Sequence, residues 1–284
     1  MKKIGTINYL TDMSTEDQHL HHSEMPDLAH MSTDEYEEYL CAEINKERVE
    51  PTYGIDCPLC GNKQTILRWD RKTQSRYSRQ CACAAQRESI RRIDASGVCR
   101  DWRDKTFDSF QTADEWQQKM KAEVMSYVEA KDHPWLYLSG QSGCGKTHLC
   151  TAAFTELIRR SRGKSVYVSW TDLVQKLEPA RFQEERYEAI VRPLMQSDLL
   201  YLDDFFKRRD GSQVTSYLFN CIMNIINQRY QNHDQITIFS SEQSLKDMIG
   251  YDEALAGRIK ERCGNHVFHV SRKIERDYRL RGLV

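Results

Sequence analysis

The chain has 284 residues, a formal net charge of −1 and 39% hydrophobic residues, which is enough for one large or two ordinary domains. No apolar run is long enough to cross a bilayer, and no apolar signal-peptide segment follows the lysines at the start. Ten cysteines are unusual for a disulfide scaffold of this size, so we expect a cytoplasmic protein whose cysteines are metal ligands and buried thiols.

Residues 1–30 are polar, and we expect them to be disordered or loosely docked. The stretch Ser32-Thr33-Asp34-Glu35 is typical of a capping box, which predicts a helix that runs to about Arg48 and ends before Pro51. Acidic residues are frequent up to residue 56, whereas residues 61–105 are rich in lysine and arginine. The basic segment could meet nucleic acid or an acidic protein surface, or it could be a solvated helix face with a loop.

Two pairs of cysteines accompany this basic segment, Cys57 with Cys60 and Cys81 with Cys83. The first pair offers two thiolates from one tight turn, in which Gly61 permits a positive φ. Four thiolates suit a closed structural zinc site with no open catalytic position. Buried or reactive free thiols are the alternative interpretation.

The segment between the pairs predicts a short hairpin, over residues 65–69 and 76–79, that returns the chain to the second pair. Trp69 and Tyr77 are interleaved with arginines there, so the module could also stack on nucleic-acid bases. A basic helix is expected over residues 86–103, and a further helix over 111–131.

From residue 135 onward, five candidate strands alternate with helical patterns. This βαβ repetition predicts a parallel sheet that is covered by helices on both faces. The candidate strands are Trp135–Ser139, Ser165–Trp170, Leu199–Asp203, Ile236–Ser240 and His266–Val270, and the helical patterns lie over 148–160, 173–177 with 187–194, 214–226 and 245–262.

The loop after the first of these strands has the pattern of a phosphate-binding loop, with an apolar strand before it and a helix after it. Its glycines let backbone N–H groups point at a phosphate, and the helix N-terminus adds a positive dipole end. Lys146 can reach the β- and γ-phosphates, and the Thr147 hydroxyl can bind Mg²⁺. We therefore expect a nucleoside triphosphate to bind at Gly140, Gln141, Ser142, Gly143, Cys144, Gly145, Lys146 and Thr147.

The third candidate strand ends in two acids, Asp203 and Asp204. Downstream of a phosphate loop, such a strand supplies the second half of the site. We expect Asp203 to hold Mg²⁺ through its water shell and Asp204 to act as the general base toward the attacking water. Two solvated loop acids are the alternative.

On these motifs the C-terminal two-thirds of the chain resembles an AAA+ ATPase. The resemblance implies an α/β fold with a five-stranded parallel sheet in the order 5-1-4-3-2 flanked by helices, and the cysteine pairs predict a small zinc-binding domain before it. It also places the polar end of the fourth strand, Ser240-Ser241-Glu242, at the sensor-1 position. Ser241 is then expected to position the attacking water near the γ-phosphate, and Glu242 replaces the asparagine usual in the family.

More narrowly, residues from about 50 to the end resemble the DnaC/DnaI-type replicative helicase loaders. Together with the capping box and the cysteine spacing, it predicts an N-terminal helix, a four-cysteine zinc module and a basic linker over 31–105, followed by an AAA+ ATPase domain over 106–284. The matching pieces are the cysteine pairs, Phe107-Asp108-Ser109-Phe110, the phosphate loop, Asp203-Asp204, Ile226-Asn227-Gln228-Arg229-Tyr230, Ala256-Gly257-Arg258-Ile259-Lys260-Glu261-Arg262 and Asp277-Tyr278-Arg279.

The Gly257-Arg258-Ile259 match implies an arginine finger, in which Arg258 reaches the γ-phosphate held by a neighbouring subunit. An ordinary surface arginine is the alternative. Arg262 is the second candidate for this role, and Arg229 could either face a neighbour or form a salt bridge at a helix end.

The resemblance implies an ATPase of DNA replication that uses ATP, Mg²⁺ and Zn²⁺. Such a protein would self-associate, bind the replicative helicase through its zinc module, and load it onto single-stranded DNA. An IstB-like transposition helper with the same core is the first alternative, although the cysteine module is not expected in its N-terminal domain. A non-enzymatic ATP-dependent switch, with the zinc module as the working part, is the second.

Overall fold

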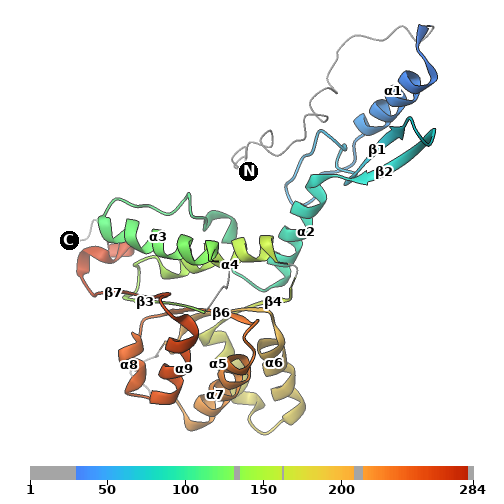
Figure 1. Cartoon of the computed structure of the whole chain (residues 1–284). Coiled ribbons are helices and arrows are strands. Elements are labelled where there is room, and N and C mark those ends of the chain that lie inside the picture. Colours follow the sequence, from blue (N-terminus) through green and yellow to red (C-terminus); the bar gives the residue numbers. More distant parts are fainter. Residues whose placement is uncertain (1–29, 131–134, 162, 208–213, 281–284) are drawn as a thin grey trace. The chain divides into compact units, whose positions relative to one another are not determined.

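The computed structural model describes residues 30–130, 135–161, 163–207 and 214–280 (Figure 1). The disorder expected for residues 1–29 therefore lies outside the described residues. The chain divides into two compact units, Met1–Arg91 and Arg92–Val284, and each is considered by itself. None of the helices in the described ranges is long and apolar enough to cross a membrane.

The first unit holds a helix, a hairpin and the start of a second helix. The predicted capping box is confirmed, because the side chains of Ser32 and Glu35 each accept a hydrogen bond from the other residue's backbone N–H. The predicted hairpin is also confirmed, with Thr65 opposite Gln80. The elements are α1 (Thr33–Lys46), β1 (Thr65–Asp70), β2 (Ser75–Gln80) and α2 (Ala82–Ala95), whose last turn lies in the second unit.

Asn45 ties α1 to the hairpin. Its amide nitrogen donates to the Leu67 carbonyl at 2.9 Å, and its amide oxygen accepts from the Leu67 N–H at 2.9 Å. The Asn45 side chain thus satisfies the backbone N–H and carbonyl of Leu67 at the outer edge of β1, as a neighbouring strand would. Ion pairs between α1 and the hairpin, such as Glu38 with Arg71, neutralise part of the basic charge of this segment.

The second unit contains the predicted five-stranded parallel sheet, in the order β4-β5-β6-β3-β7. Counted from β3, this is the expected order 5-1-4-3-2 read from the opposite edge. The strands are β3 (Leu136–Gly140), β4 (Ser165–Ser169), β5 (Leu199–Phe205), β6 (Ile236–Ser241) and β7 (Val267–Val270).

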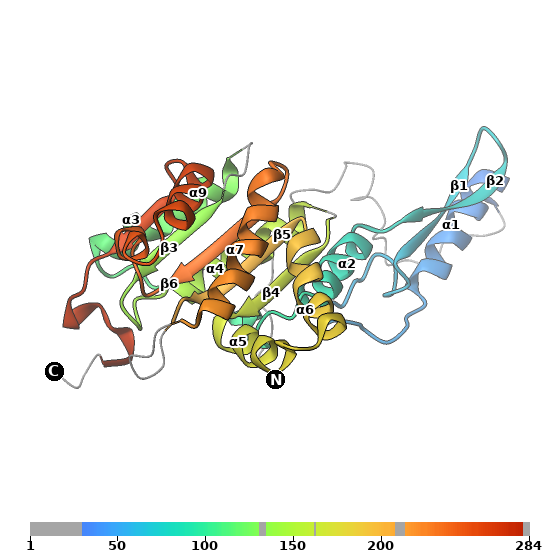
Figure 2. The same ribbon diagram turned by 90° about the horizontal axis from the view of Figure 1, so that it is seen from below.

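Helices cover both faces of this sheet, as the βαβ pattern predicts. Figure 1 shows α3 and α4 on one face and α5 to α9 on the other, and Figure 2 views the sheet from the side of the second group. The helices are α3 (Glu115–Glu129), α4 (Lys146–Arg160), α5 (Trp170–Ala180), α6 (Glu184–Gln196), α7 (Ser216–Gln231), α8 (Leu245–Ile249) and α9 (Glu253–Cys263).

Two expected helices differ from the observed ones. The pattern over residues 245–262 is two helices, because Asp252 adopts an extended conformation and caps the start of α9. The basic helix expected over 86–103 is α2, which ends at Ala95 and is followed by a short 3-10 turn at Trp102–Asp104.

Arg229, near the end of α7, is completely buried and is a structural residue. Its guanidinium donates to the Thr237 hydroxyl and to the carbonyls of Leu194, Ser197 and Ile236, at distances of 2.6 to 2.9 Å. These contacts fasten α7 to α6 and to the starts of β5 and β6. The sequence suggested that Arg229 faces a neighbouring subunit or forms a salt bridge at a helix end. The structure shows neither arrangement.

Strand β4 forms one edge of the sheet. The N–H of Tyr167 in this strand donates to the Ser96 carbonyl at 2.8 Å. The Arg92 guanidinium donates to the Ser161 carbonyl, a few residues before the strand. The segment that follows α2 therefore covers part of the outer edge of β4.

Candidate nucleotide site and cysteine cluster

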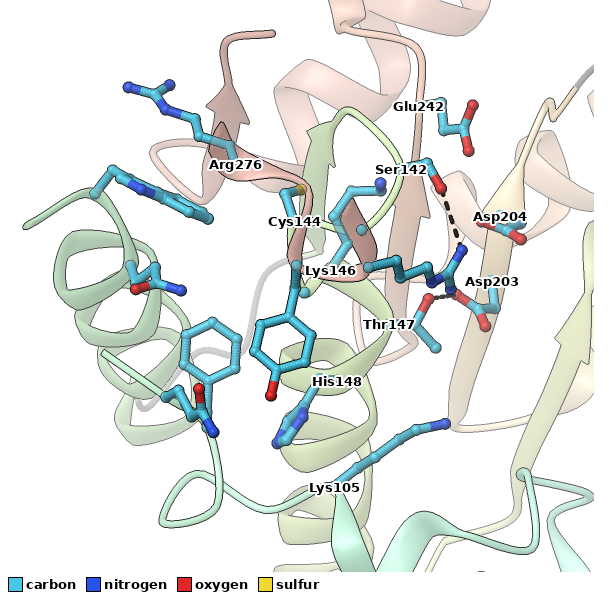
Figure 3. A pocket seen from close by; sticks show the side chains of 18 of the residues that line it. Lys105, Ser142, Cys144, Lys146, Thr147, His148, Asp203, Asp204, Glu242 and Arg276 are labelled. Carbon is cyan, nitrogen blue, oxygen red and sulfur yellow. Dashed lines mark hydrogen bonds between the residues drawn. The ribbon is translucent and has the colours of Figure 1, made fainter. Parts of the chain in front are cut away.

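The phosphate loop leaves the carboxyl end of β3 and leads into α4, which begins at Lys146. It borders a cavity of about 590 Å³. Three other parts of the second unit line the same cavity: the segment before and into α3, the end of β5 with Glu242, and the residues after β7. Segments distant in sequence thus converge around the loop (Figure 3).

Lys146 is only 5% exposed although it is a charged residue. Its ammonium group donates to the carbonyls of Gly140 and Gln141, each at 2.8 Å. These two carbonyls hold the ammonium group against the phosphate loop. The position fits a cation that meets phosphate oxygens at the same loop.

Asp203 is buried at the end of β5 and is surrounded by hydroxyl groups. Its carboxylate accepts hydrogen bonds from Thr147 at 3.0 Å, Tyr167 at 3.0 Å and Tyr201 at 2.8 Å, and from Ser240. Burial raises the pKa of both tyrosines, so they stay neutral donors. Four O–H groups can therefore stabilise the ionised carboxylate inside the protein.

The pair formed by Thr147 and Asp203 has the chemistry of a magnesium site. Figure 3 shows both side chains at the same side of the phosphate loop. Hydroxyl and carboxylate oxygens are hard ligands of the type that Mg²⁺ prefers, and Mg²⁺ usually keeps several waters when it binds such groups. The residues present therefore fit the ion that the sequence predicts.

Asp204 lines the cavity and has an unusual backbone, with φ of 53°. Its N–H donates to the Ser240 hydroxyl at 3.0 Å, and its carboxylate pairs with Lys207 at 2.8 Å. Lys207 also lies 3.5 Å from Glu242. Burial alone would lower the pKa of Lys207, but its contacts with the two carboxylates raise it, so the lysine stays charged beside Asp204.

The expectation for Ser241 is corrected by the structure. The Ser241 hydroxyl is fully buried and donates to the Phe205 carbonyl at 2.7 Å, and it does not line the cavity. Ser240 contacts Asp203 and Asp204 instead. Successive side chains of a strand point to opposite faces of the sheet, so a shift of one residue moves the hydroxyl from one face to the other.

The three arginines considered for contact with a neighbour lie in different surroundings. Arg258, on α9, is partly exposed and lies 6.0 Å from the centre of the Tyr230 ring, and it does not line the cavity of its own chain. Arg262 is 8% exposed, lies over the Trp135 ring and donates to the Gln235 carbonyl. Arg262, like Arg229, is therefore held inside its own unit and is not a candidate finger.

Several residues that line the cavity were not predicted from motif spacing. Phe110 packs edge-on against His148, with ring centres 5.2 Å apart, beside the phosphate loop. Arg276, Tyr278 and Arg279 reach the cavity from the end of the chain. The loader resemblance includes Phe110, Tyr278 and Arg279, but gives them no role, and no motif spacing links these segments to the loop.

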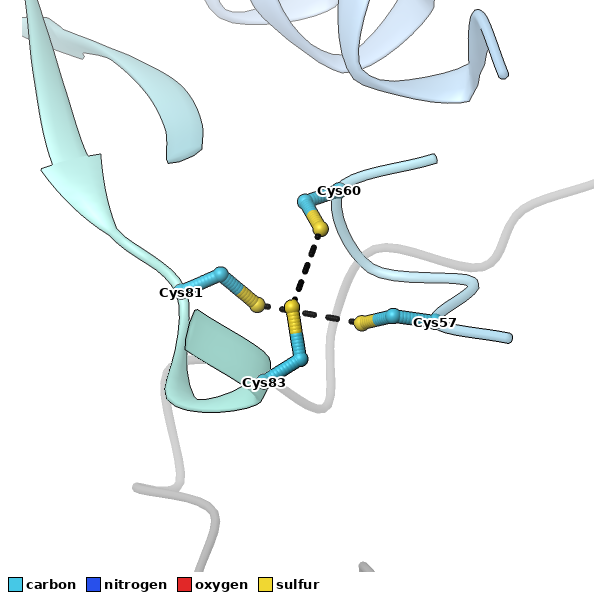
Figure 4. A group of neighbouring side chains, drawn as sticks. All are labelled: Cys57, Cys60, Cys81 and Cys83. Atoms are coloured by element: carbon cyan, nitrogen blue, oxygen red, sulfur yellow. Dashed lines mark hydrogen bonds between the residues drawn. The ribbon is translucent and has the colours of Figure 1, made fainter. Parts of the chain in front are cut away.

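In the first unit, the four predicted cysteines form one buried cluster (Figure 4). Their sulfur atoms all lie within 4.8 Å of one another, with 3.8 Å between Cys57 and Cys81 and 3.5 Å between Cys60 and Cys83. A tetrahedral zinc site with Zn–S bonds of about 2.3 Å has sulfur atoms about 3.8 Å apart. The geometry therefore fits zinc. Burial raises the pKa of Cys81, and a bound cation would favour its thiolate form.

The turn that carries the first pair is held by close backbone packing. Gly61 has φ of 55°, and a Cβ there would lie 1.9 Å from the Glu47 carbonyl oxygen, so glycine is required. Asn62 accepts a hydrogen bond from the Cys57 N–H at 2.7 Å, and the buried Arg87 donates to Asn62 at 2.9 Å. Arg87 thus fastens α2, which begins within the second pair and carries Cys83, to the turn of the first.

The strand order and phosphate loop of the second unit define an ATP-binding protein of the AAA+ class. Residues 78–282 match the family described as "IstB-like ATP binding protein", and the chain belongs to this family. Two Bacillus subtilis relatives are the phage-like element PBSX protein XkdC, 31% identical over 72% of this chain and 79% of its own length, and YqaM, 29% identical over 67% of this chain. The match spans only 63% of YqaM.

The solved structures that are similar to this chain include that of the DnaC helicase loader. That chain is 18% identical, with a TM-score of 0.46, over 62% of this chain and 100% of the loader chain.

Proposed function

We propose that this chain is a Mg²⁺-dependent ATPase of DNA replication that binds a replicative helicase and loads it onto single-stranded DNA. The observation that carries the ATPase part is the convergence of Lys146, Thr147, Asp203 and Asp204 on one cavity, in a chain of an ATP-binding family. The loader part rests on the combination of this core with the cysteine module, which is the combination that resembles the DnaC/DnaI-type loaders.

In this proposal the phosphate loop and Lys146 hold the triphosphate, and Thr147 and Asp203 hold Mg²⁺ with its waters. The metal would neutralise charge on the phosphates and orient them. Asp204 accepts the proton of the attacking water. Because Lys207 pairs with Asp204, it must shift away from that carboxylate, and Glu242 offers the second acceptor for its ammonium group.

The ATPase assignment is tested by Asp204→Asn. An amide cannot accept a proton from water, so we expect ATP binding to persist while turnover falls by about 10²- to 10⁴-fold. Asp234→Asn is the matched control, since it makes the same change at an exposed residue outside the cavity. Equal turnover of wild type and Asp204→Asn in a phosphate-release assay would reject Asp204 as the base.

The client is tested by pull-down with purified replicative helicase, with and without ATP and single-stranded DNA. Capture of the helicase by the wild-type chain, and its transfer to circular single-stranded DNA, is the expected result. The alternative is that the chain is an IstB-like transposition helper, whose client would be a transposase. If a transposase stimulates ATP turnover and a helicase does not, the chain is a transposition helper and the loader assignment is rejected.

The cysteine cluster is proposed to bind one structural Zn²⁺ per chain. Soft thiolates favour zinc over Mg²⁺ or Ca²⁺, and a small module of this kind draws its folding energy from the metal. We expect Cys57→Ser to abolish zinc content in metal analysis and to unfold the first unit locally, while ATP binding by the second unit remains. Cys41→Ser, at a buried thiol of α1 outside the cluster, should keep zinc. Wild-type protein purified without chelator and found free of zinc would reject the site.

A further inference from the structure

Arg87 places a charged side chain in the interior of the first unit. The residue is only 2% exposed. It follows Cys83 by four residues on α2, so the two side chains project from the same face of that helix. Arginine keeps its charge in proteins, and a buried charge without a compensating anion is strongly unfavourable. The surroundings of this guanidinium therefore have to supply the compensation.

The terminal nitrogens of Arg87 meet only neutral acceptors. Nη1 donates to the Thr52 carbonyl at 3.1 Å and to the Thr52 hydroxyl. Nη2 donates to the Ile55 carbonyl at 3.0 Å and to the Asn62 amide oxygen at 2.9 Å. These contacts hold the chain on both sides of the first cysteine pair. Within the described ranges, no carboxylate is among the partners of Arg87, so its charge is not offset by an ion pair.

The remaining donor of Arg87, its Nε–H, is buried and has no hydrogen-bond partner in the part of the chain that the structure describes. Burial raises the pKa of the Cys83 thiol to about 11, and contact with the Arg87 side chain acts in the opposite direction. The guanidinium thus lies beside this sulfur atom. Because a buried donor without an acceptor costs free energy, the orphaned Nε–H indicates that the neighbouring sulfur serves as an acceptor in the working protein.

Two other sulfur atoms of the cluster receive backbone donors. The Gln64 N–H is hydrogen-bonded to Cys60, and the Cys83 N–H is hydrogen-bonded to Cys81. Such donors stabilise a metal-bound thiolate and orient it. Zinc neutralises only half of the charge of four thiolates, so a filled cluster stays negative. Arg87 is a buried cation next to that charge, and it can give Cys83 the donor that the backbone gives the other two.

We propose that Arg87 is the counter-ion of the metal–thiolate cluster and that its Nε–H donates to the Cys83 sulfur when Zn²⁺ is bound. The inference rests on the proposed zinc site and deepens it, because it assigns a residue that is not a ligand but offsets the charge of the ligands. One side chain then links the two halves of the site. It contacts Cys83 of the second pair and, through Asn62, it holds the turn that carries Cys57.

The first test loads the full chain with Co²⁺ in place of zinc, because the thiolate-to-cobalt charge-transfer absorption reports on the sulfur atoms. In Arg87→Met the thiolate loses a donor and a nearby positive charge, so its electrons are held less tightly. We expect the absorption to move to longer wavelength, and zinc affinity measured against a competing chelator to fall by about 10- to 100-fold. Arg91→Met is the matched control. It removes the same charge from an exposed residue one turn further along α2, where Arg91 pairs with Glu88, and it should behave as the wild type does.

Two further variants separate the charge of Arg87 from its grip on the backbone. Thr52→Val removes one neutral acceptor of the guanidinium and leaves the charge beside Cys83 in place, so the cobalt absorption should stay at its wild-type wavelength. Arg87→Lys keeps the charge without the planar fork, and it should recover part of the zinc affinity that Arg87→Met loses.

Arg87→Met with the wild-type absorption and zinc affinity would overturn the counter-ion role and leave the zinc site standing. Equal losses in Arg87→Lys and Arg87→Met would do the same, because the charge would then make no difference. If Arg87→Met takes up no cobalt at all, uptake by Arg87→Lys supports the role of the charge and failure of both variants overturns it. A wild-type chain that takes up neither zinc nor cobalt would overturn both the counter-ion and the metal site.

Discussion

Lys146→Ala should abolish ATP binding while the fold is retained. The ammonium group is the cation of the phosphate loop, and each hydrogen bond from it to a phosphate oxygen contributes roughly 1.5–3 kcal/mol, so loss of contacts with two phosphates weakens binding by about 100-fold or more. In the structure the same group bonds only two loop carbonyls, which can turn to water in the alanine variant. Calorimetric titration with ATP and Mg²⁺ measures the effect.

Lys119→Ala serves as the control for this variant, since Lys119 is exposed on α3 of the same unit and lies outside the cavity. It should bind ATP as the wild type does. ATP affinity unchanged in Lys146→Ala would remove the phosphate loop from the site, whatever its sequence pattern.

Turnover should depend on Arg258 of a neighbouring chain. Arg258 does not reach the cavity of its own chain, and an arginine finger in related phosphoryl-transfer chemistry is worth about 10³- to 10⁵-fold in rate. We therefore expect Arg258→Ala to bind ATP normally and to lose nearly all turnover. Wild-type turnover per chain should rise with protein concentration, as association completes more sites.

Mixing two inactive variants provides the decisive measurement. Lys146→Ala chains cannot hold ATP but offer an intact Arg258, and Arg258→Ala chains hold ATP but lack the finger. In an equal mixture, about one quarter of head-to-tail interfaces join the two intact halves, so about a quarter of wild-type turnover should return. A mixture of Lys146→Ala with Asp204→Asn is the control and should stay inactive, since both changes disable the chain's own site. If turnover does not return in the mixture under conditions where wild-type chains associate, Arg258 does not act on a neighbouring site and is an ordinary surface residue.

The sheet and the phosphate loop were accessible from the sequence because both depend on local patterns. Each strand of the second unit is a short apolar run between helical patterns, and its observed bounds lie within two residues of the expected ones. The meeting of the two cysteine pairs could also be predicted from the sequence. The segment between them has β-forming residues of its own and forms a hairpin, which brings the second pair back to the first.

The features that could not be predicted from the sequence depend on the face of the sheet to which a side chain points, or on contacts between segments distant in sequence. Ser240 and Ser241 are adjacent and chemically identical, so only the alternation of the strand decides which of them meets Asp203. Arg229 and Arg262 look like surface cations on helices, yet both donate to backbone carbonyls inside the unit. The position of residues 273–279 beside the phosphate loop arises from contacts between segments more than 100 residues apart, which no local pattern predicts.

The covered edge of β4 has a consequence for shortened forms of the protein. Exposed edge strands present unpaired backbone groups to other molecules and so promote aggregation. A fragment beginning at Glu115 would keep all five strands and the phosphate loop, but it would lose Ser96, which accepts the Tyr167 N–H. Such a fragment should be less soluble than the whole chain, and residues 92–96 thus protect the ATP-binding unit from self-assembly through its sheet edge.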